Sequence, residues 1–178
     1  MGIYQQIAKT GQRFISKKKL FKYGFNLSPM YRRSTARIIE VSEDISRIRV
    51  RLKISWKNKN YVGSIFGGSM FAAVDPIPMV QLINIIGEDY VVWDKAAQIN
   101  FKRPAREHLY ATFEFTDEEI EAIKKQVAET FEIEHPKKTL LTNKDGSAIF
   151  CEIDKTLYIA DKAYYKKKRA EKEKKLRP

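Results

Sequence analysis

The chain's 178 residues and its hydrophobic fraction of 43% fit one globular domain with a well-buried core. Its net charge of +12 lies almost wholly at the ends: residues 1–23 carry six Lys/Arg and no acid, and residues 162–178 carry nine against two acids. The centre is therefore close to neutral, which argues against a nucleic-acid-binding domain, and the single cysteine, Cys151, excludes an internal disulfide.

The first thirty residues are predicted to form a basic amphipathic helix. Apolar side chains recur there near helical spacing, and turn-forming residues follow at 26–29. No run within residues 1–22 is apolar enough for a signal peptide, so we expect a cytoplasmic protein. The regularly spaced apolar residues are Ile3, Ile7, Phe14 and Ile15.

Two strands are expected next. The stretch Arg37–Val41 predicts the first, and a turn follows at 42–44. From residue 47 to residue 56 apolar and polar side chains alternate, which is typical of a strand with one buried and one solvated face. The buried face is predicted to carry Ile48, Val50, Leu52, Ile54 and Trp56.

A long buried helix is predicted from Gly68 to Ile86, where the apolar segment is too long for a strand. Pro76 and Pro78 lack a backbone N–H, so we expect the helix to bend just after Asp75. The uncharged runs on either side of Asp75 are each shorter than the ~18 residues that a membrane span requires. We therefore expect no membrane-spanning segment.

The second half of the chain predicts four strands and one short helix. The helix, at 117–130, begins with a capping box from Thr116 to Glu119. One-sided alternation in most strands predicts an antiparallel sheet covered on one face by the central helix, which is an α+β fold. The charged tail from Lys162 is expected to be either a solvated helix or disordered. Strands are expected at about 90–102, 108–115, 131–141 and 147–160.

The segment from Asn60 to Asp75 combines residues suited to act on a carbonyl group. It reads N-Y-V-G-S-I-F-G-G-S-M-F-A-A-V-D, in which Gly67 and Gly68 open the apolar helix. The first N–H groups of a helix can polarise a carbonyl, and a nearby carboxylate can act as base or nucleophile. Two alternatives remain: the glycines serve close packing of helix on sheet, and Asp75 satisfies backbone donors or a partner base.

The spacing N-x5-F-G-G-x6-D resembles the motif N-x5-H-G-G-x6-D of the phenylacetate-type hotdog acyl-CoA thioesterases. The run I-N-F-K-R-P-A-R at 99–106 looks like the strand and turn that follow in that family. Together with V-V-W-D-K-A-A at 91–97, the motif is similar to a poorly characterised bacterial branch of the superfamily. The resemblance covers about residues 30–160 and implies a hotdog fold, an antiparallel sheet wrapped around a long central helix.

The resemblance also implies roles for individual residues. The family's catalytic acid falls on Asp75, its carbonyl-polarising N–H on Gly67 or Gly68, and its polar residue before the helix on Asn60. Phe66 stands where the family has histidine, and a phenylalanine packs without forming side-chain hydrogen bonds. Family members work as dimers, often paired into tetramers, with their sites at the subunit interface, and the same is implied here.

Three basic residues are candidates for contact with coenzyme A. Lys102, Arg103 and Arg106 follow a strand near a proline turn, where they can meet phosphates; the alternative is a solvated basic turn. The two histidines, His108 and His135, match no metal spacing, and there is no glycine-rich phosphate loop. We therefore expect no metal, no bound cofactor and no specific nucleic acid.

The sequence thus predicts a basic amphipathic helix at 1–30, a hotdog domain at 31–160 and a charged tail at 161–178. The predicted function is binding and hydrolysis of an acyl thioester, acyl-CoA or a related compound, at a dimer-interface site. The alternative is a non-catalytic acyl or acyl-CoA binding protein, which Phe66 favours. Predicted catalytic residues are Asp75, Gly67, Gly68 and Asn60, and predicted substrate-binding residues are Phe66, Lys102, Arg103 and Arg106.

Overall fold

The structure, a computed structural model, describes residues 16–176. Most of the predicted N-terminal helix, including Ile3, Ile7, Phe14 and Ile15, lies outside the described residues. The helices and strands, in chain order, are α2 (Lys17–Leu27), α3 (Pro29–Arg33), β1 (Ala36–Val41), β2 (Arg47–Leu52), α4 (Gly67–Val74), α5 (Pro76–Ile86), β3 (Tyr90–Phe101), β4 (Leu109–Glu114), α6 (Asp117–Thr130), β5 (Glu132–Thr142), β6 (Ile149–Asp161) and α7 (Lys162–Leu176).

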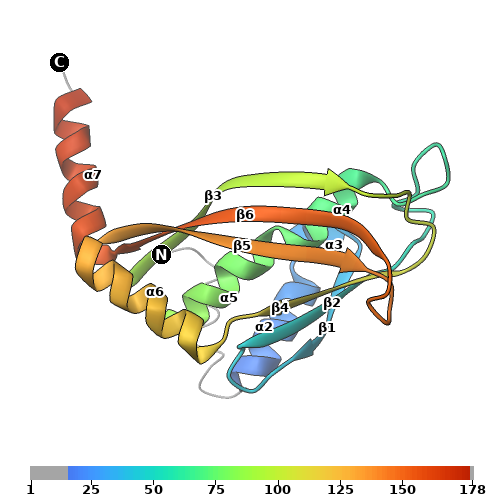
Figure 1. The fold of residues 1–178 in the computed structure, drawn as a ribbon, viewed down its shortest axis with the longest axis horizontal. Coiled ribbons are helices and arrows are strands. Elements are labelled where there is room, and N and C mark those ends of the chain that lie inside the picture. The colour runs from blue at the N-terminus through green and yellow to red at the C-terminus, as the bar shows by residue number, and fades with distance from the viewer. Residues whose placement is uncertain (1–15, 177–178) are drawn as a thin grey trace.

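Six antiparallel strands form one sheet in the order β1-β2-β4-β5-β6-β3. The sheet curves around α4 and α5, which run along its inner face (Figure 1). Apolar residues of α4, such as Met70 and Ala73, share a buried core with Ile48 and Val50 of β2. This arrangement confirms the predicted α+β fold, an antiparallel sheet around a central helix.

The second strand ends at Leu52, and the prediction that Trp56 faces the core is wrong, because its side chain is 84% exposed. The side chain of Asn58 accounts for the early end. Its Oδ1 accepts a hydrogen bond from the Ser55 N–H at 2.8 Å, and its Nδ2 donates to the Lys53 carbonyl at 2.9 Å. These bonds occupy backbone groups that a continuing strand would pair with its neighbour, so the chain turns out of the sheet.

The central helix bends at Asp75, between α4 and α5, as its prolines predicted. Side chains from outside the helix bind carbonyl groups beside the bend. The Tyr31 hydroxyl donates to the Ala73 carbonyl at 2.9 Å, and the Lys155 ammonium donates to the Asp75 carbonyl. Burial raises the pKa of Tyr31 well above its ordinary value, so its phenol remains a donor. The bend is therefore tied to the rest of the domain by specific hydrogen bonds.

By length and composition alone, the helical stretch Gly67–Ile86 is long and apolar enough to cross a membrane. The same stretch is the bent central helix of this fold, and core helices of soluble proteins meet that criterion too. Its one carboxylate, Asp75, forms an ion pair with Lys155 of the sheet. The stretch is accordingly weak support for a membrane span.

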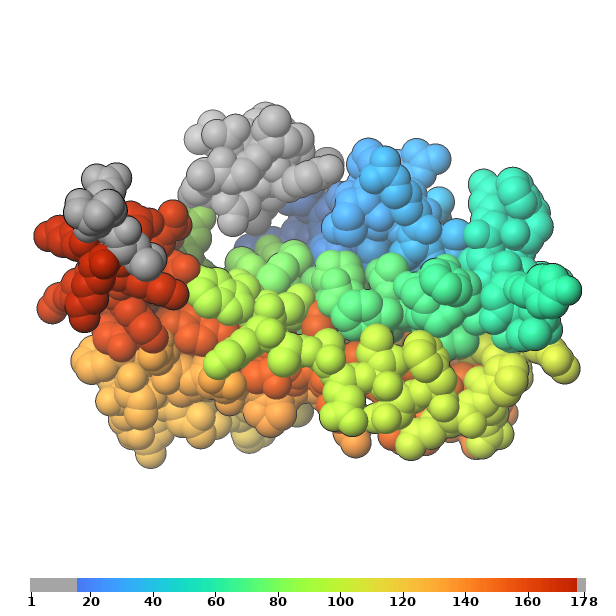
Figure 2. Space-filling view, turned by 90° about the horizontal axis from the view of Figure 1, so that it is seen from above, coloured from blue at the N-terminus to red at the C-terminus, as the bar shows by residue number. Residues whose placement is uncertain are grey.

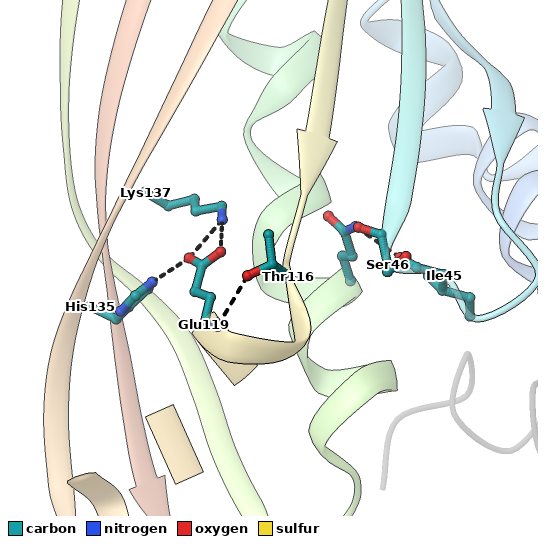
Figure 3. A network of polar contacts seen from close by, with 7 residues as sticks. Ile45, Ser46, Thr116, Glu119, His135 and Lys137 are labelled. Atoms are coloured by element: carbon teal, nitrogen blue, oxygen red, sulfur yellow. Dashed lines mark hydrogen bonds and ion pairs between the residues drawn. The ribbon is translucent and has the colours of Figure 1, made fainter. Parts of the chain in front are cut away.

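Helix α6 is joined to β5 by an ion-pair cluster (Figure 3). Thr116 Oγ1 accepts a hydrogen bond from the Glu119 N–H, which is one half of the predicted capping box. The Glu119 carboxylate turns instead to β5, where it lies 2.7 Å from Lys137 Nζ and 2.8 Å from His135 Nε2. This cluster therefore takes the carboxylate that would have completed the capping box.

Gln81 fixes α5 to the turn between β1 and β2, which contains Ile45 and Ser46. Its buried side-chain amide donates to the carbonyl of Ile45 at 2.8 Å and to that of Ser46 at 2.9 Å. A buried amide that donates two hydrogen bonds holds the helix at one position along the sheet.

The charged tail was expected to be either a solvated helix or disordered. It forms helix α7, which projects from one end of the sheet (Figure 1). Two tyrosines anchor its first turn. The Tyr164 ring stacks on Phe131 with centroids 5.3 Å apart, and Tyr165 packs edge-on against Trp93 at 5.1 Å. Most of the basic residues farther along α7 are exposed.

Cys151 is buried in β6. Burial, with a smaller effect of the Glu152 charge, raises the pKa of the thiol to about 11. The thiol is therefore protonated at neutral pH and a poor nucleophile.

Candidate functional site

Asp75, the predicted catalytic acid, lies at the bend of the central helix against the inner face of β6. Lys155 Nζ of β6 is 2.8 Å from Asp75 Oδ1 and 2.8 Å from Asp94 Oδ2 of β3. The side chain of Lys155 is 1% exposed, that of Asp94 is 25% exposed and that of Asp75 is 40% exposed. One buried ammonium thus binds two carboxylates. Lys155 is therefore a partner base for Asp75, which was one of the alternatives for this residue.

The two carboxylates differ in their surroundings. Burial raises the pKa of Asp94 above its ordinary value, the hydrogen bond and charge of Lys155 oppose that rise, and the charge of Asp75 adds to it. The second oxygen of Asp94, Oδ1, is buried and has no hydrogen-bond partner among residues 16–176. Asp75 is consequently the carboxylate of this cluster that solvent or a substrate can reach.

Sequence reasoning missed Lys155 and Asp94. Lys155 occupies a buried position of β6 between Ile153 and Leu157. A charged residue thus stands on the face of the strand whose other side chains are apolar and point into the core. That pattern is a usable signal, since a fully buried lysine needs a partner carboxylate. Asp94 offers no comparable signal, because the burial of β3 does not alternate along the strand.

The start of α4 presents the glycine pair beneath two aromatic rings. A Cβ built on Gly67 would lie 2.8 Å from Phe101 Cζ, and one on Gly68 would lie 2.3 Å from Phe66 Cε1. A Cβ at either position would displace one of these rings, and because both rings belong to exposed side chains that can move, neither contact by itself makes glycine obligatory. No side chain caps the helix, and the N–H groups of Ser69 and Met70 already bond to the carbonyl before Gly67. The N–H groups of Gly67 and Gly68, which precede them, thus keep their donor capacity.

Asn60 shapes its own loop. Its Oδ1 accepts hydrogen bonds from the N–H groups of Val62 at 3.1 Å and Ser64 at 3.0 Å, and its Nδ2 donates to Ser64 Oγ at 2.9 Å. Both polar atoms of the side chain are engaged within residues 60–64. The structure therefore gives Asn60 a local structural role beside its predicted place at the site.

The loop after β3 carries the three predicted basic residues, Lys102, Arg103 and Arg106, next to the start of α4. A hydrogen bond of 2.8 Å from the Ile65 N–H to the Ala105 carbonyl joins this loop to the segment that leads into α4. The basic residues and the helix start, more than thirty positions apart in the chain, are thus neighbours in the fold.

The surroundings of the three basic residues differ. Lys102 forms an ion pair with Glu152 at 2.9 Å, and the Arg103 guanidinium lies 5.8 Å from the centroid of the Phe150 ring. Arg106 is exposed. A phosphate would therefore compete with Glu152 for Lys102.

Distance along the helix separates the two halves of the predicted catalytic site. Asp75 follows Gly67 by eight residues, which at 1.5 Å per residue is about 12 Å. One carbonyl group cannot lie within hydrogen-bond reach of both. Within a single chain, the acid and the N–H donors do not converge.

Neither histidine belongs to a metal site. His108 Nδ1 accepts a hydrogen bond from the Ile54 N–H at 3.3 Å, and His135 binds Glu119. Within residues 16–176, no group of three or more His, Cys, Asp or Glu side chains is arranged to hold a metal ion.

The fold is shared with solved structures of thioesterases. The probable thioesterase PA5026 of Pseudomonas aeruginosa, described as a protein of unknown function, aligns with a TM-score of 0.69 and 19% identity over 80% of this chain and 95% of its own. The thioesterase HI1161 of Haemophilus influenzae aligns with a TM-score of 0.57 and 12% identity over 82% and 91%. The thioesterase SAV0944 of Staphylococcus aureus aligns with a TM-score of 0.54 and 12% identity over 75% of this chain and 99% of its own.

These similarities show that the chain shares the hotdog fold of these solved structures, which confirms the predicted fold class. Residues 17–156 match the family described as domain of unknown function DUF4442. The chain belongs to that family. Among curated proteins no sequence relative was found.

Proposed function

We propose that this protein binds an acyl thioester and hydrolyses it at a site shared between two copies of the chain. The observation that carries the proposal is the setting of Asp75: a half-exposed carboxylate, fixed by a buried lysine, on a helix whose uncapped start presents glycine N–H groups. A carboxylate and a set of backbone donors are the two parts that acyl transfer to water requires.

A second copy of the chain would resolve the separation of about 12 Å between Asp75 and Gly67 along the helix. Strand β3 stands at the edge of the sheet, and residues 95–98 of it are exposed. Beside it, α4 and α5 reach the surface between α2 and β3 (Figure 2). If two copies pair through this edge, Asp75 of one chain can approach the start of α4 of the other, as in the phenylacetate-type dimers that the motif resembles.

The chemistry assigned to the site is hydrolysis of the thioester bond. The N–H groups of Gly67 and Gly68 polarise the carbonyl, and Asp75 takes a proton from water while the water oxygen bonds to the carbonyl carbon. The C–S bond then breaks, and the thiolate takes up a proton. In the nucleophilic variant the Asp75 carboxylate attacks the carbonyl carbon itself, the C–S bond breaks and the thiolate leaves; water then hydrolyses the mixed anhydride, which releases the carboxylic acid and restores Asp75. Lys155 acts as a positioning residue, because it donates one hydrogen bond to the Asp75 carboxylate and another to the Asp75 backbone carbonyl.

The same neighbourhood suits an acyl-CoA. The exposed rings of Phe66 and Phe101 offer an apolar contact for the acyl part beside the helix start. Arg103 and Arg106, and Lys102 if it leaves Glu152, supply cations for phosphates. Asn60 contributes by holding the shape of the loop that precedes Phe66.

The deciding experiment measures thiol release from a panel of acyl-CoAs by the wild type and by Asp75→Asn. We expect kcat to fall on the order of 100-fold or more in the variant, because it lacks the base. Asp154→Asn, which removes an exposed carboxylate from β6, is the matched control and should keep the wild-type rate. Equal rates in the wild type and Asp75→Asn would remove Asp75 from the chemistry.

The alternative is a binding protein without turnover, and Phe66 is the feature that favours it. A side chain that can only pack stands where the motif that this segment resembles has a hydrogen-bonding histidine. Calorimetric binding of an acyl-CoA with no release of thiol would select this alternative. Under the hydrolase proposal Phe66→His should increase kcat, whereas a pure binding protein would show weaker binding and still no thiol release.

A further inference from the structure

The loop between β2 and α4, residues 53–66, projects from the end of the molecule opposite α6 and α7 (Figure 1). We call it the β2–α4 loop. Four large apolar side chains on it are exposed: Phe66 at its junction with α4, and Trp56, Tyr61 and Val62 farther out, with Tyr61 at 105% of its reference area. Side chains of this size are ordinarily covered at least in part, so their display at one projecting end points to a binding surface.

The β2–α4 loop has a defined shape. Asn58 is buried, and its Nδ2 donates to Thr35 Oγ1 at 2.8 Å as well as to the loop's own backbone. The Asn60 turn and an antiparallel bridge between Lys59 and Ile65 brace the outer part. The aromatic side chains are therefore presented on a braced frame, which reduces the entropy lost when they bind.

The same loop is basic. Lys53, Lys57 and Lys59 are exposed, and the chain has no Asp or Glu between Asp44 and Asp75. The ammonium of Lys57 lies 5.4 Å from the centroid of the Trp56 ring, so cation and aromatic ring share one surface. The adjoining loop after β3 adds three basic residues, Lys102, Arg103 and Arg106, and one exposed acid, Glu107.

We propose that the β2–α4 loop docks on the surface of an anionic lipid bilayer. Tryptophan and tyrosine place an apolar ring and a polar tip at the boundary between headgroups and acyl chains, and Val62 adds an aliphatic contact. Lysines near the surface gain energy from anionic headgroups. The positive charge and the exposed aromatic rings thus both suit an anionic bilayer. This docking does not depend on the proposed hydrolysis.

The charge and shape of the loop favour a bilayer over other occupants. A single-stranded nucleic acid would need rings arranged as a stacking platform along a basic groove, whereas here the rings stand on a projecting loop. A second copy of this chain would bring three more lysines against these three, which is unfavourable. The basic helix α7 lies at the other end of the molecule, so its contribution can be tested separately.

The two tryptophans of the chain make the test specific. Trp93 stacks on Tyr158 with centroids 4.5 Å apart, near α7, so Trp93→Phe leaves Trp56 as the reporter of the β2–α4 loop. We expect the emission of Trp56 to shift to shorter wavelength with phosphatidylglycerol vesicles, and to be quenched when the lipid chains are brominated. In Trp56→Phe, the emission of Trp93 should stay unchanged under the same conditions.

Charge variants define the binding face. Replacing Lys53, Lys57 and Lys59 by glutamine in the Trp93→Phe background should weaken vesicle binding on the order of 100-fold, since each lysine near the surface contributes about fivefold. The matched control replaces three exposed lysines of α7, Lys166, Lys167 and Lys172, by glutamine, and the Trp56 response should persist. Circular dichroism of both triple variants checks that the fold is intact.

Several outcomes would overturn the proposal. One is a Trp56 spectrum that vesicles leave unchanged, and another is an equal response to pure phosphatidylcholine. A third is loss of the response in the α7 variant but not in the loop variant. A Trp56 shift that depends only on protein concentration would assign the loop to a second copy of the chain. A shift with RNA or coenzyme A but not with vesicles would assign it to those ligands.

Discussion

At the scale of single residues, Lys155 is the side chain on which the candidate site depends. It is almost wholly buried, and its ammonium group is within 2.8 Å of carboxylate oxygens of Asp75 and Asp94. A charge removed from water in this way is tolerated only when partners satisfy it. The ion-pair cluster therefore links the position of the central helix to β6 and to the edge strand β3.

Lys155→Met should lower the free energy of unfolding by about 3 kcal/mol, because it leaves the half-buried Asp94 without its cation. Urea denaturation followed by circular dichroism measures the change. Lys138→Met is the matched control, since Lys138 of β5 forms a solvent-accessible ion pair with Asp154 of β6, the strand that carries Lys155, and should change stability by less than about 1 kcal/mol. Similar losses in the two variants would contradict a special role of the buried lysine.

The sequence contained part of this information. A lysine between Ile153 and Leu157 interrupts the apolar phase of β6, and that interruption marks a buried charge. Its partners could not be inferred, because Asp75 lies 80 positions away and is brought to Lys155 only by the packing of helix on sheet. The same limit applies to Gly67, whose aromatic neighbour Phe101 belongs to a later strand.

At the scale of elements, the bend of the central helix shows how local chemistry and packing combine. The prolines after Asp75 interrupt the hydrogen-bond ladder of the helix, and their position in the sequence predicted the bend. What holds the bent helix in place comes from other elements: Tyr31 of α3 and Lys155 of β6 donate to carbonyl groups beside it.

Tyr31→Phe should reduce the free energy of unfolding by about 1–2 kcal/mol, because it removes the buried donor to the Ala73 carbonyl while keeping the ring in place. Thermal and urea denaturation measure the loss. The control is Tyr23→Phe on α2, where the ring is exposed and little change is expected. A Tyr31→Phe variant with the same free energy of unfolding as the wild type would mean that the hydrogen bond contributes nothing to holding the bend.

Helix α6 offers a test of pH dependence through Glu119. Burial alone would raise the pKa of this carboxyl, but the hydrogen bonds and charges of Lys137 and His135 outweigh burial and lower the pKa below its ordinary value of 4.5. The unfolded chain therefore binds the proton more readily. The stabilisation is present above pH 4.5 and is lost as the pH falls through the lower pKa of the folded state.

Glu119→Gln should accordingly lower the free energy of unfolding at neutral pH by about 1–2 kcal/mol, and the difference from wild type should shrink below pH 4.5. Denaturation curves at several pH values measure this. Glu121→Gln removes an exposed carboxylate from the same helix and should have little effect at any pH. A loss for Glu119→Gln that is constant with pH would show that the ion pairs with β5 are not its source.

At the scale of the whole molecule, the open edge of the sheet is the feature with the largest consequence. Strand β3 is paired on one side by β6, and small or polar residues at 96–98 are exposed along it. A long unpaired edge of this kind is a template for pairing with another strand. It is also where a second chain would have to lie for Asp75 to meet the start of a helix.

We expect the wild type to sediment as a dimer or a tetramer, and Ala97→Lys to shift it towards monomers, because two lysines would then oppose each other across the paired edges. Analytical ultracentrifugation measures the assembly, and thiol release should fall in parallel. Thr112→Lys, on an exposed position of the interior strand β4, is the control and should leave assembly intact. A monomeric wild type that releases thiol would contradict the shared site.

The resemblance of the N-x5-F-G-G-x6-D motif implied the hotdog layout, and the sequence by itself determined most of the helices and strands, their order and the bend at Asp75. Those features follow from apolar periodicity and from proline and glycine chemistry, which act over a few neighbouring residues. Only the tertiary structure decided that Trp56 points outward, that Lys155 joins Asp75 to Asp94, and that the aromatic rings of Phe66 and Phe101 cover the glycines. The physical reason is that such contacts depend on how strands register and how the helix packs on the sheet, and these join residues far apart in the chain.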